Sequence, residues 1–559
     1  MKKTLLLTAF IFIIAMLSLN NCKSPDTDQD NSTKDTVETK TLTLKDKVDE
    51  FAMVELTTDL SVLSENQKKI LVLLIKVARI MDDIYWKEVF HEDHNVFINK
   101  LKDESYKDFV KINYGPWERL NGNKPFIENI NEKPKGSGFY PVDMTHDEFN
   151  ALEDKYKTSL YTILRRKETS GPLTVHFYHD YFKNETEEAA DLLKQAAELA
   201  ENEGFKKYLE LRAEALLTDE YFDSDIAWMD MKNNIIDFVV GPIETYEDAL
   251  YGYKAAHEAF LLIKDMEWSN KLERFASLIP DLQQSLPVED KYKSDSPGSD
   301  SDLGVYDAIY YAGDCNAGSK TIAINLPNDE KVRETKGSRK LQLKNSIKAK
   351  FDKILVPISD ILIAEDQKKH IKFDAFFENI MFHETGHGLG MGNTVDGSGT
   401  VREALKDQYT AIEECKADIL GLYIIGVLYD KGELTTGELM DNYVTFIAST
   451  FRSVRFGISS SHGKANMITF NYFKDKGAFT YDKEKGTYRV DFDKTKEAVS
   501  SLAAKVLTIQ GDGDYEAAKT LIEENGKIMP CLQKDLDRIS EAGIPRDIVF
   551  RQGEEILGL

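Results

Sequence analysis

The sequence predicts a mainly helical α+β fold. Residues 65–90 and 403–429 carry apolar side chains at helical spacing, and residues 185–217 are rich in Ala, Glu and Leu, so each segment favours one long helix. Two runs rich in β-branched residues, 235–242 and 321–329, predict strands, and the Gly-Pro that closes the first run predicts a turn there. With 559 residues, 42% of them hydrophobic, the chain is long enough for two to four domain-sized units.

The N-terminus predicts export. Two lysines precede an apolar run, residues 5–17, which is too short for a typical membrane span, so residues 1–22 are interpreted as a signal peptide. The run ends in L-N-N-C, which resembles a bacterial lipoprotein processing site whose cysteine, here Cys22, is lipidated and holds the protein at the cell envelope. Simple cleavage and an uncleaved anchor are the alternatives. Residues 23–47 are almost devoid of apolar side chains and predict a disordered tether, with the folded body beginning near Val48.

Composition excludes several other functions. The formal net charge of −25 argues against nucleic acid or anionic lipid as a partner through bulk electrostatics. The four cysteines show no C-x-x-C spacing, so they indicate neither a cysteine-ligated zinc site nor a dense disulfide framework.

The main functional signal is the sequence F-H-E-T-G-H, residues 382–387. On a helix, His383 and His387 lie one turn apart on one face, so both rings can point at one metal ion. Glu384 projects beside that ion, where a glutamate serves as general base for a metal-bound water. Apolar residues between 373 and 381 recur at helical spacing and predict that a buried helix carries the motif. The alternative is a pair of solvated histidines on a surface helix.

A catalytic zinc site needs a third protein ligand. The known extension H-E-x-x-H-x-x-G-x-x-H fails here, because Asn393 stands where the last histidine belongs. The other source is the predicted helix 403–429, which contains the pair Glu413 and Glu414. Adjacent helical side chains point about 100° apart, so we choose one of the pair, Glu414, as the ligand. Asp418, one turn beyond it, could hold the free ring nitrogen of one ligand histidine, and Glu413 that of the other. Without the upstream histidines, these acids would be interpreted as a solvated helix face.

The pairing of H-E-x-x-H with E-E-C-K-A-D, residues 413–418, resembles the dipeptidyl-peptidase III family of zinc peptidases. In that family the second glutamate of the latter motif is the third zinc ligand, which corresponds to Glu414, and the first and last acids support the ligands. Most members carry six residues from the first to the second histidine. The five residues from His383 to His387 are similar to a divergent bacterial branch.

The same resemblance implies a set of substrate-binding residues. An acidic residue four positions before a strand glycine holds the free amine of the peptide in the family, and this role would pass to Asp237. A tyrosine that contacts substrate in many members is replaced here by Val239. The sequence N-x-P-N matches the segment whose asparagines bind the N-terminus and backbone of the peptide, which are Asn325 and Asn328 here. By residue chemistry alone, this segment would be an ordinary exit from a strand into a turn.

His462 precedes a predicted helical run that extends to Tyr472. A zinc peptidase needs a donor for the oxyanion that develops as water adds to the scissile carbonyl, and an imidazole near the metal can supply it. The family has a histidine at the corresponding point, so His462 is our candidate for this donor. A helix-capping histidine is the alternative.

The resemblance implies two lobes flanking a substrate cleft, one helical and zinc-binding, the other mixed with a small β-sheet or barrel. It implies one zinc ion per chain and the release of dipeptides from short peptides with free N-termini, although cobalt or manganese would also suit the ligands. A less specific zinc endopeptidase or aminopeptidase, and a peptide-binding envelope lipoprotein with a weak metal site, are the alternatives. The predicted division is a mixed lobe at 48–258, with 303–345 and the C-terminal end, a helical lobe at 259–302 and 346–540, and a terminal segment at 541–559.

Overall fold

The computed structural model describes residues 43–293 and 301–559. The predicted signal peptide, Cys22 and the tether up to residue 42 lie outside the described residues. The prediction of a tether to residue 47 is wrong at its end, because helix α1 (Leu44–Asp49) already begins at Leu44. The side chain of Thr43 accepts a hydrogen bond from the Asp46 amide, and Asp46 in turn accepts one from the Thr43 amide. None of the helices within the described ranges is long and apolar enough to cross a membrane.

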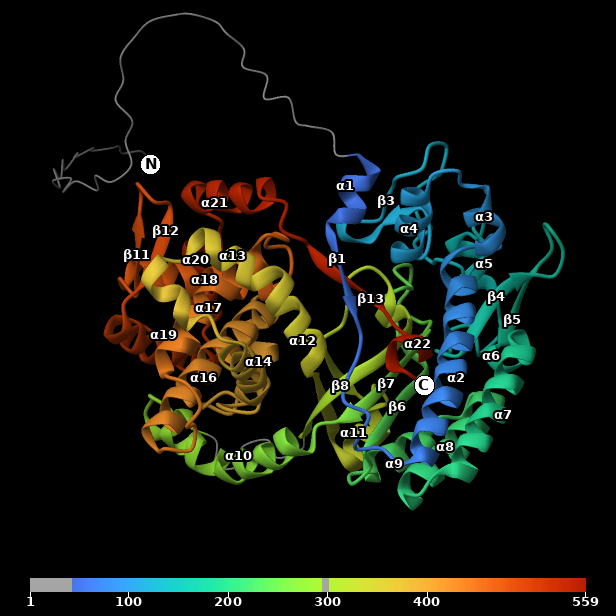
Figure 1. Ribbon diagram of the computed structural model, residues 1–559, viewed down its shortest axis with the longest axis horizontal. Helices are drawn as coiled ribbons and strands as arrows, with labels where there is room; N and C mark the ends of the chain where they lie inside the picture. Colours follow the sequence, from blue (N-terminus) through green and yellow to red (C-terminus); the bar gives the residue numbers. More distant parts are fainter. Residues whose placement is uncertain (1–42, 294–300) are drawn as a thin grey trace, which may run out of the picture. The chain divides into compact units, whose positions relative to one another are not determined.

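The structure has two lobes, each with a hydrophobic core of its own, in agreement with the predicted mainly helical α+β class (Figure 1). The helices of the mixed lobe are α2 (Glu65–Val89), α3 (His94–Lys100), α4 (Glu104–Asn113), α5 (His146–Ala151), α6 (Tyr178–Tyr181), α7 (Lys183–Leu199), α8 (Glu203–Thr218), α9 (Phe222–Asp230) and α11 (Glu330–Lys336). Its short strand pairs are β2 (Trp117–Glu118) with β3 (Lys124–Pro125) and β4 (Thr162–Arg166) with β5 (Leu173–Phe177).

A five-stranded sheet forms the centre of the mixed lobe. Its strand order is β6-β7-β8-β10-β9, which places β9 at an edge of the sheet. The β8–β10 pair is parallel, and the other three pairs are antiparallel. The strands are β6 (Ile236–Glu244), β7 (Ala256–Lys264), β8 (Ser301–Gly313), β9 (Ala323–Leu326) and β10 (Ser338–Leu343). Helix α2 packs on β7 and β8 through its apolar face (Figure 1). The two ends of the sheet approach each other, since Arg339 on β10 contacts Asp237 on β6 at 3.0 Å.

The helical lobe surrounds α14 (Phe373–His387) and α16 (Tyr409–Asp430), which pack directly on each other. Its other helices are α10 (Met266–Ser285), α12 (Lys344–Lys350), α13 (Val356–Leu362), α15 (Val401–Leu405), α17 (Leu439–Val454), α18 (Ser461–Asp475), α19 (Phe492–Asp512), α20 (Tyr515–Asn525) and α21 (Pro530–Glu541). One hairpin, β11 (Phe479–Asp482) with β12 (Thr487–Val490), lies at its edge. Near the C-terminus, β13 (Asp547–Arg551) pairs in parallel with β1 (Phe51–Glu55), and α22 (Glu554–Leu557) follows.

Several predicted element boundaries differ from the structure. The single helix expected at 185–217 is the pair α7 and α8, with Asn202 capping the second helix. The helix expected at 403–429 is interrupted at Lys406, whose φ of +50° lies in the left-handed region. The strand expected to end at Gly-Pro continues as β6 to Glu244, with a register shift after Pro242. The predicted lobe boundary after residue 258 falls inside β7, and the helical segment α10 begins at Met266.

Candidate active site

The helix that carries H-E-x-x-H is confirmed, and it packs unusually close to the helix that carries E-E-C-K-A-D. A Cβ on Gly386 would lie 2.6 Å from the carbonyl oxygen of Ala417, and one on Gly421 would lie 3.0 Å from the amide nitrogen of His383. Real Cβ atoms essentially never lie as close as 2.6 Å to a heavy atom and seldom as close as 3.0 Å, so glycine at both places allows α14 and α16 to approach. This contact brings the acids of α16 to the histidines of α14.

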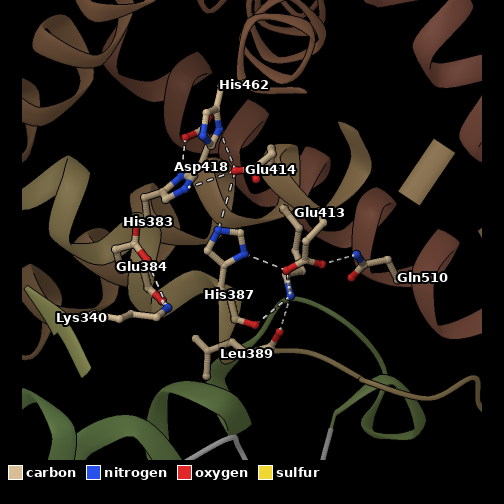
Figure 2. Close-up of polar contacts among 11 residues, drawn as sticks. Lys340, His383, Glu384, His387, Leu389, Glu413, Glu414, Asp418, His462 and Gln510 are labelled. Atoms are coloured by element: carbon tan, nitrogen blue, oxygen red, sulfur yellow. Dashed lines mark hydrogen bonds and ion pairs between the residues drawn. The ribbon is translucent and has the colours of Figure 1, made fainter. Parts of the chain in front are cut away.

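The three predicted metal ligands meet in one cluster (Figure 2). Oε2 of Glu414 lies 3.4 Å from Nε2 of His383 and 3.7 Å from Nε2 of His387. Ligands about 2.0–2.2 Å from a tetrahedral zinc are separated by roughly 3.3–3.6 Å, which matches this spacing. The Glu414 oxygen is buried yet accepts no well-formed hydrogen bond from the rings around it. Two imidazoles and one carboxylate therefore fit a divalent metal, and within residues 43–293 and 301–559 no other cluster of this kind occurs.

The other ring nitrogen of each ligand histidine is held by an acid. Nδ1 of His383 lies 2.7 Å from Asp418, and Nδ1 of His387 lies 2.9 Å from Glu413. In a metal-bound state each Nδ1 would keep its proton for the acid, and the Nε2 lone pair would be free to bind the ion. The structure thus brings Glu413 and Asp418 to the positions expected from the sequence.

Three residues that the sequence analysis did not assign hold these two acids. Asn466 on α18 donates to Asp418 at 2.7 Å, and Gln510 on α19 donates to Glu413 at 2.8 Å. Lys416 lies 2.9 Å from Glu413. Lys416 is visible in the motif itself, but Asn466 and Gln510 come from distant helices without any local motif, so only the tertiary structure identifies them.

The cluster stabilises positive charge. Burial alone would lower the pKa of His383, but the carboxylates of Asp418 and Glu414 outweigh burial and raise that pKa to about 10. Burial likewise opposes ionisation of Glu414, yet His383 and His462 hold the pKa of Glu414 well below its usual range. An excess of ionised acids around two imidazoles is the charge balance that a bound cation would satisfy.

Glu384 lies beside the cluster and contacts the other lobe. Nζ of Lys340, on strand β10, lies 3.1 Å from the Glu384 carboxylate and donates to the Glu384 carbonyl oxygen at 3.2 Å (Figure 2). Burial raises the pKa of Glu384, but Lys340 and the two ligand histidines lower it further than burial raises it. The side chain is therefore a carboxylate at neutral pH, as a general base must be. No local sequence pattern points to Lys340, which lies in an ordinary strand.

His462 reaches the same cluster from α18. Its Nδ1 lies 2.8 Å from Oε2 of Glu414, and its ring centroid lies 5.9 Å from that of His383. The side chain is 66% exposed, unlike the two ligand histidines, so it can meet a substrate from the solvent side. The structure thus places His462 next to the metal ligands.

Of the three predicted substrate-binding residues, Asp237 is not exposed. Its side chain is fully buried between the ends of the sheet, where it accepts hydrogen bonds from Trp228 at 2.8 Å and Arg339 at 3.0 Å. In this structure Asp237 is paired with Arg339 and is not open to a peptide amine, so its role in holding that amine stays a prediction. Asn325 and Asn328 are both exposed.

Known proteins similar to this chain are peptidases in most cases. Residues 150–401 match the sequence profile of Peptidase family M49. The structure of DPP III from Caldithrix abyssi is 41% identical, with a TM-score of 0.87 over 91% of this chain and 99% of that one. The dipeptidyl-peptidase III from Corallococcus sp. strain EGB is 35% identical, with a TM-score of 0.74 over 91% of this chain and 96% of that one.

The matches to two curated relatives cover a smaller share of those relatives' length. A protein named Nudix hydrolase 3 from Arabidopsis thaliana is 35% identical over 91% of this chain and 74% of its own length, so part of that protein lies outside the match. Dipeptidyl peptidase 3 from Dictyostelium discoideum is 24% identical over 54% of this chain and 46% of its own.

The fold and the cluster on α14 and α16, together with these similarities, define a metallopeptidase. Its two-lobed architecture is that of the solved dipeptidyl-peptidase III structures. The chain belongs to Peptidase family M49, the dipeptidyl-peptidase III family, which confirms the resemblance seen in the two motifs.

Proposed function

We propose that the protein is a zinc-dependent exopeptidase that releases dipeptides from short peptides with free N-termini. The observation that carries the proposal is the position of Glu384, which lies beside the His383, His387 and Glu414 cluster and is held by a lysine of the five-stranded sheet. A general base next to a three-ligand metal site is the arrangement that hydrolyses amide bonds.

The ligands would hold one zinc ion, which would polarise the scissile carbonyl and lower the pKa of the attacking water. Glu384 accepts the proton of that water and later passes it to the leaving amine. His462, exposed beside Glu414, donates a hydrogen bond to the oxyanion that forms at the carbonyl carbon. Asp418 and Glu413 keep the two ligand rings in the tautomer and orientation that bind metal.

Strand β9 supports an extended peptide as the substrate. It pairs with β10 on one side, and no other strand in the described part of the chain pairs with its second side. Asn325 on β9 is the register partner of Lys340, so both side chains lie on one face of the sheet, the face that reaches Glu384. A peptide added to the open edge of β9 would therefore run past the catalytic base.

The direct test uses residues 43–559, which form one compact unit. We expect about one zinc per chain, release of dipeptides from free peptides but not from N-acetylated ones, and loss of hydrolysis in Glu384→Ala with the metal retained. Cleavage of blocked peptides would favour the less specific endopeptidase. Bound zinc with no hydrolysis of any peptide would overturn the enzyme proposal in favour of a peptide-binding protein.

We also propose, from residues 1–22 alone, that the protein is exported and lipid-anchored at Cys22. The test is fatty-acid labelling of the full chain and of Cys22→Ser in a bacterial host. Labelling lost in the variant supports the anchor, and a soluble, unlabelled wild type contradicts it.

A further inference from the structure

A second cleft, which we call the loop cleft, lies in the mixed lobe. Its volume is about 540 Å³, which is within the range of small-molecule sites. Three segments form its walls, residues 119–125, 132–137 and 246–249, and Asp314, which directly follows β8, also lines it. Neither the candidate metal ligands nor the asparagines of the β9 edge line this cleft, so what it binds can be measured apart from peptide hydrolysis.

The loop cleft is lined by more cations than anions, although the whole chain carries a formal net charge of −25. Its cations are Arg119, Lys124, Lys133 and Lys135, and its anions are Glu132, Glu247 and Asp314. Lys124 and Lys135 are exposed, and neither forms an ion pair with any residue in the ranges 43–293 and 301–559. Two ammonium groups, one from each of two walls, are therefore available to a ligand.

The acids Glu247 and Asp314 are already engaged by groups of the protein. The Glu247 side chain is 3% exposed and pairs with both Arg119, at 3.0 Å, and Lys133. Asp314 accepts a hydrogen bond from Tyr85 at 2.8 Å, and burial and the charge of Glu247 raise the pKa of Asp314 to about 6. Arg119 and Lys133 thus share one carboxylate, which balances only part of their combined positive charge.

Arg119 and Lys133 are also held in place, as the groups of a binding site must be. Arg119 donates through Nε to the Asn113 carbonyl oxygen and through a terminal nitrogen to the Tyr85 hydroxyl, each at 2.8 Å. Burial and the charge of Arg119 lower the pKa of Lys133 more than Glu247 raises it. An anion beside Lys133 would offset both the repulsion and the lost hydration.

The backbone of the cleft walls is strained at two positions. Asn123 has a φ of +57° and Ser137 a φ of +43°, in the left-handed region that residues other than glycine seldom adopt. The Ser137 hydroxyl donates to the Glu247 carboxylate, which fixes this wall against the acid that pairs with Arg119 and Lys133. Such conformations persist where the surrounding structure enforces them, and they are concentrated at ligand sites.

We propose that the loop cleft binds a small molecule with at least two negative charges, carried by phosphate or carboxylate groups. Lys124 and Lys135 supply two ammonium groups without a partner, and Lys133 supplies a third that Glu247 already fixes. Ammonium and guanidinium groups form charge-assisted hydrogen bonds with both kinds of oxyanion. A dianion would balance the two exposed lysines.

The test measures the binding of inorganic phosphate and of succinate to the zinc-loaded chain 43–559, by calorimetry and by thermal unfolding at mildly alkaline pH. We expect Lys124→Gln/Lys135→Gln to bind the anion about 10- to 100-fold more weakly than the wild type, because charge-assisted hydrogen bonds are lost. Its melting temperature without ligand should be unchanged, since both side chains are exposed. Lys102→Gln/Lys207→Gln, which removes two exposed lysines of the same lobe outside the cleft, is the matched control and should bind as the wild type does.

Either anion bound more weakly by the cleft variant than by the control supports the site, and the anion that binds more tightly shows whether phosphate or carboxylate is the preferred group. The proposal is overturned if neither anion binds at millimolar concentration. It is also overturned if the cleft variant and the control lose affinity equally, since general attraction to the surface would then explain the binding. Lys133→Met is a second check, because wild-type affinity in this variant would place the anion outside the loop cleft.

Discussion

The candidate metal cluster in the helical lobe and the proposed substrate edge in the mixed lobe are built in different ways. The cluster and its two supporting acids come from α14 and α16, within residues 383–418, and helical spacing fixes how the side chains point. The substrate edge combines the end of β6, the edge of β9 and Lys340 of β10. Local spacing therefore determines the first site, whereas closure of a sheet determines which side chains are exposed at the second.

The largest effect is expected from removing a metal ligand. Glu414→Gln replaces an anionic ligand by a neutral amide, so we expect loss of bound zinc and a fall in peptide hydrolysis of at least about 1,000-fold. Elemental analysis and a hydrolysis assay measure the two quantities. Glu497→Gln, an exposed acid on α19, should change neither. Full zinc content with full activity in Glu414→Gln would show that the cluster is not the metal site.

A smaller effect is expected from the acids that hold the ligand rings. Asp418→Asn and Glu413→Gln should each weaken zinc binding about 10- to 100-fold, because the rings lose a charged partner that orients them. Titration with a metal buffer measures this affinity. Asp237→Asn, also a buried acid but in the other lobe, should leave zinc affinity unchanged. An equal loss in all three variants would mean that general destabilisation, not ring orientation, explains the result.

The same contrast explains what the sequence could and could not predict. His383, Glu384, His387 and Glu414 were identified because their spacing on a helix is itself the chemistry of the site. Asp237 has the spacing from Gly241 that the family motif requires. Its exposure, however, depends on Arg339, about a hundred residues away in the sequence, whose guanidinium forms an ion pair with the Asp237 carboxylate. The interruption of the helix at Lys406 cannot be predicted from local spacing either, because the apolar spacing continues across it.

The close contact between α14 and α16 can be tested at Gly386. A methyl group there would meet the Ala417 carbonyl at 2.6 Å, so Gly386→Ala should force the helices apart and lower the free energy of unfolding by about 1–3 kcal/mol. Gly392 is the matched control, because a Cβ there meets no heavy atom within 4 Å. Denaturant unfolding of both variants measures the difference. Equal stability would show that the helices can separate without cost.

Lys340 joins the two regions, and its removal should have the smallest but most specific effect. Burial raises the pKa of Glu384 and Lys340 is the first of the groups that lower it, so in Lys340→Met this pKa should rise. Because the base must be ionised, the acidic limb of the kcat/KM profile should move to higher pH, with a loss of about 3- to 10-fold at mildly acidic pH and little loss at alkaline pH. Lys331→Met, on the exposed face of α11, should leave the profile unchanged. If the acidic limb of the kcat/KM profile does not move and KM rises equally at every pH, Lys340 instead belongs to the proposed peptide-binding edge. The shape of the pH profile therefore decides to which of the two regions Lys340 belongs.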